Sequence, residues 1–523
     1  ARAQASLPVV VYASRTHSQL SQVQRELGRA GFKVRSAVLS SRAQTCLNPA
    51  VKTLPQSTAG RVCRGLMQKR ACRHYLGVDP YLKAEPEAGL AVRDLEELVR
   101  LGTQRTLCPF VLSRQLATDA DVLFVPYNYL IEPAKRRSLS VPWERAVLVF
   151  DEAHNLESAC SDAASFDLPA ATLGAAVEEL GTAAELALLR DEGGQGSQKK
   201  EDKSAAETSA ELRQAQIILR KLEQAIAELD VPKTGRTEPG AFLFQLFAKV
   251  RLTPETWPLL ASAFETALDV LTQNASEAGR SSGSRSSSYR LHAVSDALSL
   301  AFETCPPPGE GGDSRDSSAA SPSAHLGYRV HVHLEQSRSQ GFPLPTLSFW
   351  CFAPGQALKA LQQLSVRSVL LTSGTLSPLG SFAAELGLPF RHRLENPHVI
   401  DPSQVWVGVV PRGPTGAALN SSFLTRDSPE YRRDLGAAVV NFARIVPDGM
   451  LVFFASYGLL TSAVEAWQAS PAGGESVWDR IARHKSPIVE PRDAALFGQA
   501  VADFKAKLDA PGSKGAVLFA VCR

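Results

Sequence analysis

Residues 146–154 read AVLVFDEAH, a short apolar run that ends abruptly in two adjacent carboxylates. A continuous apolar run of this length is typical of a strand buried on both faces of a parallel sheet that helices cover. In open sheets of this kind, functional residues lie just beyond the carboxyl ends of the strands. The stretch therefore predicts an α/β fold with a functional site that begins at Asp151.

The same pattern recurs along the chain. Further predicted strands occupy residues 7–13, 122–125, 368–371, 406–410, 450–454 and 516–521. Polar or small residues follow several of them, including Ser14-Arg15-Thr16-His17, Pro126-Tyr127-Asn128 and Thr372-Ser373-Gly374-Thr375. We expect these segments to lie at the functional edge of the sheet.

The segments between the predicted strands define the domain organisation. Residues 1–40, 116–164 and 346–394 are expected to form one α/β lobe, and residues 395–523 a second. Residues 41–115, the cysteine insert, carry four of the eight cysteines. Residues 165–345, the arch insert, are mainly helical in pattern, as in 210–229, where apolar residues recur at a spacing of three to four.

Composition excludes several classes of protein. The 523 residues are 44% hydrophobic and 21% charged, which is ordinary for a globular protein, and the formal net charge is only +3. Contact with nucleic acid must therefore come from local basic patches. No apolar run reaches 18 residues, so we expect no membrane partner. Eight cysteines are too few for a disulfide scaffold, so clustered cysteines are better interpreted as metal ligands.

The acidic pair after the strand suits Mg²⁺-dependent nucleotide hydrolysis. Asp151 can hold the metal through water, because Mg²⁺ prefers hard oxygen ligands and keeps several waters. Glu152 can orient and deprotonate the attacking water, and His154 can sense the state of the γ-phosphate. The alternative is an acidic strand-to-helix turn in which Asp151 caps the helix.

A second candidate site consists of four cysteines separated by sixteen, eight and thirty-five intervening residues: Cys46, Cys63, Cys72 and Cys108. These spacings lack the close pairs usual in structural zinc sites. Thiolates suit either zinc or an iron–sulfur cluster, so the residues alone leave both open. Four unrelated buried thiols are a third interpretation, which the surrounding basic residues disfavour: Arg64, Lys69, Arg70, Arg73 and Arg105.

Four segments occur in the order found in iron–sulfur DNA helicases of superfamily 2. VVVYASRTHSQLSQV, DEAH, SVLLTSGTLSPL and MLVFFASYG resemble motifs Ia, II, III and IV of that family. The resemblance covers nearly all of the chain apart from the Gly/Ser-rich loops. It implies two RecA-like motor lobes with parallel sheets, an iron–sulfur insert and a mainly helical arch insert.

The resemblance also implies roles for individual residues. The four cysteines of the cysteine insert would hold a [4Fe–4S] cluster. Motif Ia, which lies along single-stranded DNA in the family, corresponds to Arg15, Thr16, His17, Ser18 and Gln19. An alternative for this motif is a polar helix cap formed by Thr16 or Ser18. Motif III would couple the ATP site to DNA through Thr372, Ser373, Gly374 and Thr375.

By the same resemblance, we expect an ATP-dependent 5′–3′ DNA helicase of the nucleus that uses ATP and Mg²⁺. Its implied roles are telomere maintenance, DNA repair and the dismantling of recombination intermediates. The expected partners are single-stranded and branched DNA, including telomeric and displacement loops, together with replication or telomere proteins.

Three motifs of such a motor have no match. The phosphate-binding pattern G-x-x-x-x-G-K-[ST] does not occur, and nothing corresponds to motifs V and VI. We therefore expect a fragment with a truncated second lobe that is inactive alone. Two other hypotheses stay open: a non-catalytic iron–sulfur module that binds DNA, and a zinc-stabilised nuclease or other hydrolase.

Overall fold

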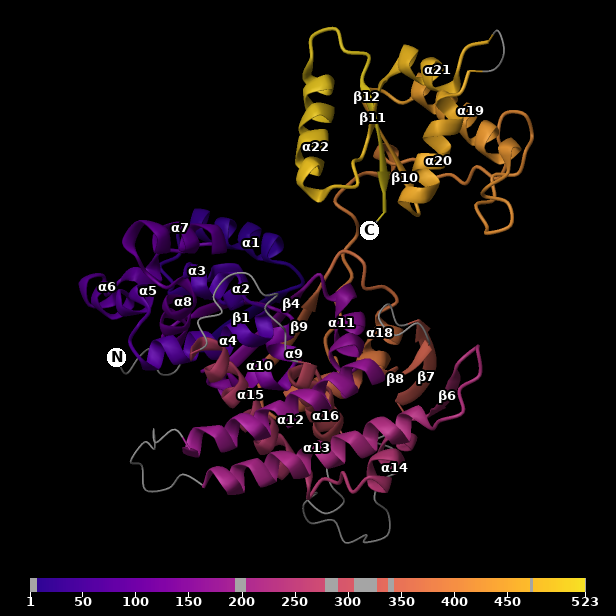
Figure 1. The fold of residues 1–523 in the computed structure, drawn as a ribbon. Helices are drawn as coiled ribbons and strands as arrows, with labels where there is room; N and C mark the ends of the chain where they lie inside the picture. Colours follow the sequence, from indigo (N-terminus) through magenta and orange to yellow (C-terminus); the bar gives the residue numbers. More distant parts are fainter. Residues whose placement is uncertain are drawn as a thin grey trace. The chain divides into compact units, whose positions relative to one another are not determined.

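The computed structural model describes residues 7–192, 204–277, 290–304, 327–336, 343–470 and 474–522. The chain divides into two compact units, residues 1–393 and 394–523, which Figure 1 shows in colours that follow the sequence. Among the described helices, none is both long enough and apolar enough to span a membrane.

The first unit contains a five-stranded sheet in the order β2-β3-β1-β4-β9, and every neighbouring pair is parallel. The strands are β1 (Val9–Ser14), β2 (Ser36–Val38), β3 (Val122–Pro126), β4 (Ala146–Asp151) and β9 (Ser368–Thr372). Four of them confirm predicted strands. The prediction missed β2, because three residues are too few to display a pattern.

Helices cover both faces of this sheet. On one face lie α1 (His17–Arg29) and α8 (Pro109–Thr118), which enclose Tyr12 and Phe124. On the other face lie α9 (Asn128–Ile131), α11 (Leu156–Ala163), α17 (Gly355–Gln362) and α18 (Leu379–Leu386), with α10 (Pro133–Arg137) following α9. Val11 and Leu148 are fully buried beneath this second group. Alternate residues of β1 therefore enter different cores, as expected for a strand between two helical layers.

The cysteine insert is built from short helices. They are α2 (Arg42–Thr45), α3 (Pro49–Lys52), α4 (Gln56–Gln68), α5 (Arg73–Leu76), α6 (Val78–Ala84) and α7 (Leu95–Arg105). Among the described residues around α2, α3 and α4, the hydrophobic cluster has three buried members, Cys46, Val51 and Ala59, with a few partly buried side chains packed against them. So small a core gives these helices little stability of their own.

The arch insert combines helices with an antiparallel sheet. Its helices are α12 (Ala170–Glu192), α13 (Ala205–Ala227), α14 (Ala241–Lys249), α15 (Trp257–Glu277) and α16 (Arg290–Thr304), and α12 packs beside α13 (Figure 1). The sheet has the order β5-β8-β7-β6, from β5 (Phe166–Pro169), β6 (Arg236–Pro239), β7 (Tyr328–Gln336) and β8 (Pro343–Cys351). The predicted boundary at residue 345 falls inside β8, which pairs with β7 along its length.

The second unit has a three-stranded parallel sheet in the order β10-β12-β11. Its elements are α19 (Pro429–Ile445), β10 (Gly449–Phe454), α20 (Tyr457–Gln468), α21 (Val477–His484), β11 (Ser486–Val489), α22 (Ala494–Asp509) and β12 (Ala516–Val521). The central strand β12 is buried between α19–α21 on one face and α22 on the other. The predicted strand at 406–410 is wrong: these residues pair with no strand in the described part, and Trp406 is 78% exposed.

A buried arginine joins the cysteine insert to the arch insert. Arg61 of α4 is 7% exposed in its side chain and pairs with Glu265 at 2.7 Å and with Asp269 at 2.5 Å, both on α15. The two carboxylates are 61% and 60% exposed. The buried guanidinium of Arg61 needs both carboxylates to compensate its charge, whereas the carboxylates keep most of their contact with water and lose less when the pair is broken.

We predict that the two sides of this contact respond unequally to substitution. The double variant Glu265→Gln/Asp269→Asn leaves Arg61 charged and uncompensated, and should lower the local opening free energy of α4 by about 3 kcal/mol. The variant Arg61→Met leaves two solvated carboxylates and should lower it by about 1 kcal/mol or less. Amide hydrogen exchange of α4 measures both values, and equal losses would contradict the asymmetry.

Candidate functional site

Three predicted segments meet at one edge of the first sheet. Asp151 is the last residue of β4 and lies opposite Thr372 of β9 in the parallel register. On the other side, Phe150 lies opposite Ala13 of β1. The residues after β1, β4 and β9 therefore leave the sheet beside one another. The strand register alone therefore brings three segments together: residues 15–19, the expected DNA-contacting segment; residues 151–154, the acidic segment; and residues 372–375, the expected coupling segment.

A turn directs the acidic segment across this edge. Glu152 adopts a left-handed backbone conformation with φ 54°, which is uncommon for a residue other than glycine. Ser373 Oγ donates a hydrogen bond to Glu152 Oε2 at 3.1 Å, and His154 Nδ1 lies 2.7 Å from the same hydroxyl. Ser373, in the segment after β9, thus contacts two of the three candidate side chains that follow β4, Glu152 and His154.

The hydrogen bonds form a chain with one direction. Arg15 Nη1 donates to Asn155 Oδ1 at 2.9 Å, so the amide nitrogen of Asn155 faces His154 Nε2, 2.8 Å away. An amide nitrogen only donates, so Nε2 accepts and the imidazole proton resides on Nδ1. Nδ1–H then donates to Ser373, which donates to Glu152. This network runs continuously from the segment after β1 to the carboxylate of Glu152.

The alternative of an acidic helix cap does not describe Asp151. That residue ends the strand, and the short turn that follows has Glu152 at its cap position without a side-chain capping hydrogen bond. Helix α11 likewise begins after Asn155 without such a bond. The carboxylate of Glu152 is engaged by Ser373 instead.

The segment after β1 has both a structural and an exposed component. Thr16 caps α1 by accepting from the main-chain N–H of Gln19, whose side chain accepts from the main-chain N–H of Thr16. The capping alternative therefore holds for Thr16 and not for Ser18. Burial lowers the pKa of His17, an effect that a hydrogen bond with Gln44 opposes. Arg15 and Ser18 remain exposed, although Arg15 donates to Asn155.

Two tyrosines that the sequence did not single out enclose Asp151. The hydroxyl of Tyr127 donates to the main-chain carbonyl of Asp151. Burial, and then a hydrogen bond to Asp151 with the charges of Asp151 and Glu152, raises the pKa of Tyr12. Burial with the same two charges raises the pKa of Tyr127. Both phenols stay protonated donors. Tyr127 directly follows a predicted strand, and this position is the feature of the sequence that could have identified it as a site residue.

We predict that Tyr127→Phe destabilises the first unit by about 1–2 kcal/mol, because it removes the partner of a main-chain carbonyl beside a buried ring. Tyr129→Phe is the matched control: Tyr129 is 7% exposed, and its hydroxyl makes no hydrogen bond within the described residues. Urea denaturation followed by near-ultraviolet circular dichroism measures both variants. Equal midpoints for the two would remove the role assigned to the Tyr127 hydroxyl.

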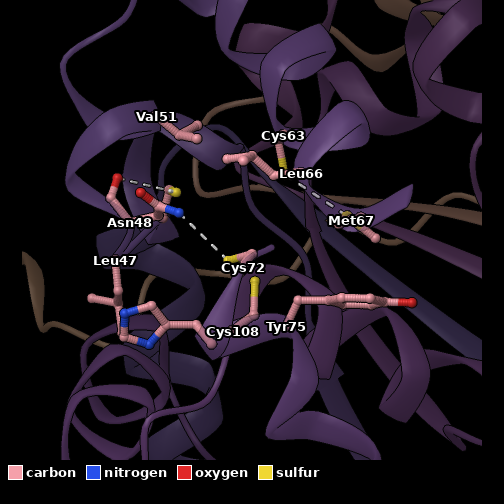
Figure 2. A pocket seen from close by; sticks show the side chains of 11 residues that line it. Leu47, Asn48, Val51, Cys63, Leu66, Met67, Cys72, Tyr75 and Cys108 are labelled. Carbon is pink, nitrogen blue, oxygen red and sulfur yellow. Dashed lines mark hydrogen bonds between the residues drawn. The ribbon is translucent and has the colours of Figure 1, made fainter. Parts of the chain in front are cut away.

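The four cysteines of the cysteine insert line one small cavity of about 20 Å³. Cys46 follows α2, Cys63 lies within α4, and Cys72 and Cys108 immediately precede α5 and α8. Figure 2 labels three of these cysteines, Cys63, Cys72 and Cys108, among mainly apolar side chains. All four are free thiols. Residues from four separate helical segments therefore converge on one space.

The cavity presents soft sulfur donors in a buried and mainly apolar setting. Burial raises the pKa of Cys46 and raises that of Cys108 to about 11, so metal-free thiols there stay neutral. His74 also lines the cavity, and its buried Nδ1 has no hydrogen-bond partner within the described residues. In the same residues, no three His, Cys, Asp or Glu side chains form a group suited to a metal ion. The donor set is compatible with a cluster, and the basic residues around it are exposed.

Comparison with known proteins matches family models to most of the chain. The DEAD_2 model matches residues 12–173, the model of the RTEL1 helicase ARCH domain matches 175–354, and the helicase C-terminal domain model matches 439–523. A solved structure named XPD_Helicase aligns with a TM-score of 0.46 at 16% identity, covering 98% of this chain and 72% of that chain.

Curated relatives match over nearly the whole chain. Regulator of telomere elongation helicase 1 homolog of Oryza sativa subsp. japonica is 41% identical, over 99% of this chain and 50% of that protein. The Arabidopsis thaliana homolog is 40% identical (99% and 48%), and Regulator of telomere elongation helicase 1 of Homo sapiens is 36% identical (99% and 43%). The chain spans about half the length of the curated relatives it matches. It belongs to the regulator of telomere elongation helicase family.

Proposed function

We propose that this protein is an ATP-dependent DNA helicase that moves 5′ to 3′ along single strands. The direction of movement rests on the family resemblance alone. The observation that carries the motor function is the network of hydrogen bonds from Arg15 through Asn155, His154 and Ser373 to Glu152. A motor needs a physical link between the group that acts on ATP and the groups that hold its track. This network supplies one, because both of its ends lie at the functional edge of the sheet.

The acidic pair divides the work of hydrolysis. Asp151, held by two tyrosines at the end of β4, would hold Mg²⁺ through water, and the ion would neutralise phosphate charge. Glu152 would orient the attacking water and accept its proton. His154 would register the change at the γ-phosphate, because its Nδ1 proton lies between Ser373 and the carboxylate of Glu152.

We predict that Glu152→Gln in the full-length protein abolishes ATP hydrolysis while nucleotide binding survives. The glutamine amide can still accept the hydrogen bond from the Ser373 hydroxyl, but it cannot take a proton from the attacking water. Glu157→Gln is the control, since this exposed carboxylate lies on the following helix α11. Phosphate release and binding of a fluorescent nucleotide analogue measure the two properties. Unchanged turnover in Glu152→Gln would refute the role of this residue.

DNA would lie along the segment after β1 and reach the coupling segment after β9. Thr372, Gly374 and Thr375 are exposed, whereas Ser373 is half-buried and bonded to His154. The hydroxyl of Ser373 is therefore the part of this segment that transmits the state of the ATP site.

We predict that Ser373→Ala in the full-length protein leaves basal hydrolysis within about three-fold, and lowers the DNA-stimulated rate and unwinding by about ten-fold or more. The reason is that the substitution removes the hydroxyl that bridges His154 and Glu152 and leaves only their direct contact at 3.2 Å. Ser381→Ala, at an exposed position of α18, is the control. Full DNA stimulation in Ser373→Ala would show that coupling runs elsewhere.

The cysteine insert would hold a [4Fe–4S] cluster through Cys46, Cys63, Cys72 and Cys108. Convergence of the four thiols on one cavity supports this proposal, together with the small buried core around α2–α4. Thiolate–iron bonds would supply the stability that this core lacks. The exposed basic residues, including Arg64 and Arg73, would then offer DNA phosphates a surface.

The biological roles follow from the family. We propose action in the nucleus on single-stranded and branched DNA, including telomeric and displacement loops, in telomere maintenance, DNA repair and the dismantling of recombination intermediates. Replication or telomere proteins would be the partners. The names of the curated relatives support the telomeric part of this proposal.

A further inference from the structure

We infer that Asn48 is a positioning residue of the cysteine cavity, whose side-chain N–H donates to the sulfur of Cys72 and raises the reduction potential of the bound cluster. The inference rests on the [4Fe–4S] cluster proposed above. It concerns a residue beside the ligands rather than a ligand, and its measurable consequence is a potential rather than an enzymatic rate.

The orientation of the Asn48 amide is fixed by a second hydrogen bond. Asn48 caps α3, and its Oδ1 accepts from the main-chain N–H of Ala50 at 3.0 Å. With the oxygen so occupied, the amide nitrogen faces Cys72 Sγ at 3.6 Å, as the dashed line in Figure 2 shows. The opposite orientation would set two N–H groups against each other at the cap. The contact with Cys72 is therefore a donor contact.

This donor differs in kind from the others around the cavity. A main-chain group of Val111 hydrogen-bonds to Cys108, and Cys63 lies 3.8 Å from the sulfur of Met67. Neither contact is a side-chain N–H donor. Asn48 is the residue whose N–H can be removed by substitution while its cap is kept.

The direction of the effect follows from charge. Reduction adds one electron to a cluster that four thiolates already make anionic, and no bond forms or breaks. A hydrogen bond to a ligand sulfur stabilises the more negative state more strongly, because charged acceptors bind donors more tightly. Hydrogen bonds to sulfur are among the factors that set cluster potentials. The Asn48 donor should therefore favour the reduced form.

The test uses two variants that preserve the cap. Asn48→Ser keeps a cap oxygen and removes the N–H donor, whereas Asn48→Asp keeps the cap and places a negative charge beside Cys72. Full-length protein is purified without oxygen, its iron and sulfide are measured, and it is titrated with dithionite in a spectroelectrochemical cell. Visible absorbance and electron paramagnetic resonance follow the one-electron step. We expect a lower midpoint potential in Asn48→Ser and a still lower one in Asn48→Asp, with metal content unchanged.

The outcomes separate the two proposals. Zinc or no metal in the wild-type protein would overturn the cluster itself. A wild-type cluster with the same potential in both variants would overturn the role of Asn48, since a residue that only caps α3 leaves the potential unmoved. Loss of iron from both variants would assign Asn48 to the fold alone and would overturn it equally.

Discussion

The parallel register of β4 between β1 and β9 is the constraint on which the site depends. It places Phe150 opposite Ala13 and Asp151 opposite Thr372, so three chain segments leave the sheet at the same edge. Each segment then needs only a short turn to reach the others. A shift of one residue in β4 would turn its buried side chains to the opposite face, so burial of Leu148 and Phe150 also fixes where the carboxylates lie.

The hydrogen-bonded network is specific because each member has one available role. Asn155 accepts from Arg15 with its oxygen, and this bond decides which atom faces His154. The tautomer of His154 follows, and with it the direction in which Ser373 donates. The hydrogen bond from Arg15 to Asn155 thus decides which ring nitrogen of His154 carries the proton, and so which donors face Glu152. Such a network rigidifies the site without burying it completely.

The sequence predicted the strands around Asp151 because AVLVF carries a pattern that burial imposes on any central strand. It did not predict the bond between Arg15 and Asn155, since their proximity arises from strand order, and no local pattern encodes strand order. The segment 406–410 has the same apolar character but pairs with no strand in the described part of the chain. An apolar run indicates that a segment tends to be buried. Whether it becomes a strand also depends on a neighbouring strand to pair with, and that strand lies elsewhere in the sequence. Asn48 stands directly before a proline, a local pattern typical of a helix start, but no local pattern indicates its contact with the sulfur of Cys72.

Helix α4 carries two attachments within one turn. Cys63 faces the cysteine cavity, and Arg61, two residues earlier, holds α15 of the arch insert. A rigid helix transmits displacement along its length, so whatever orders one attachment also steadies the other. The packing of the cysteine cavity and the position of α15 thus depend on the same helix, although the two inserts lie far apart in the sequence.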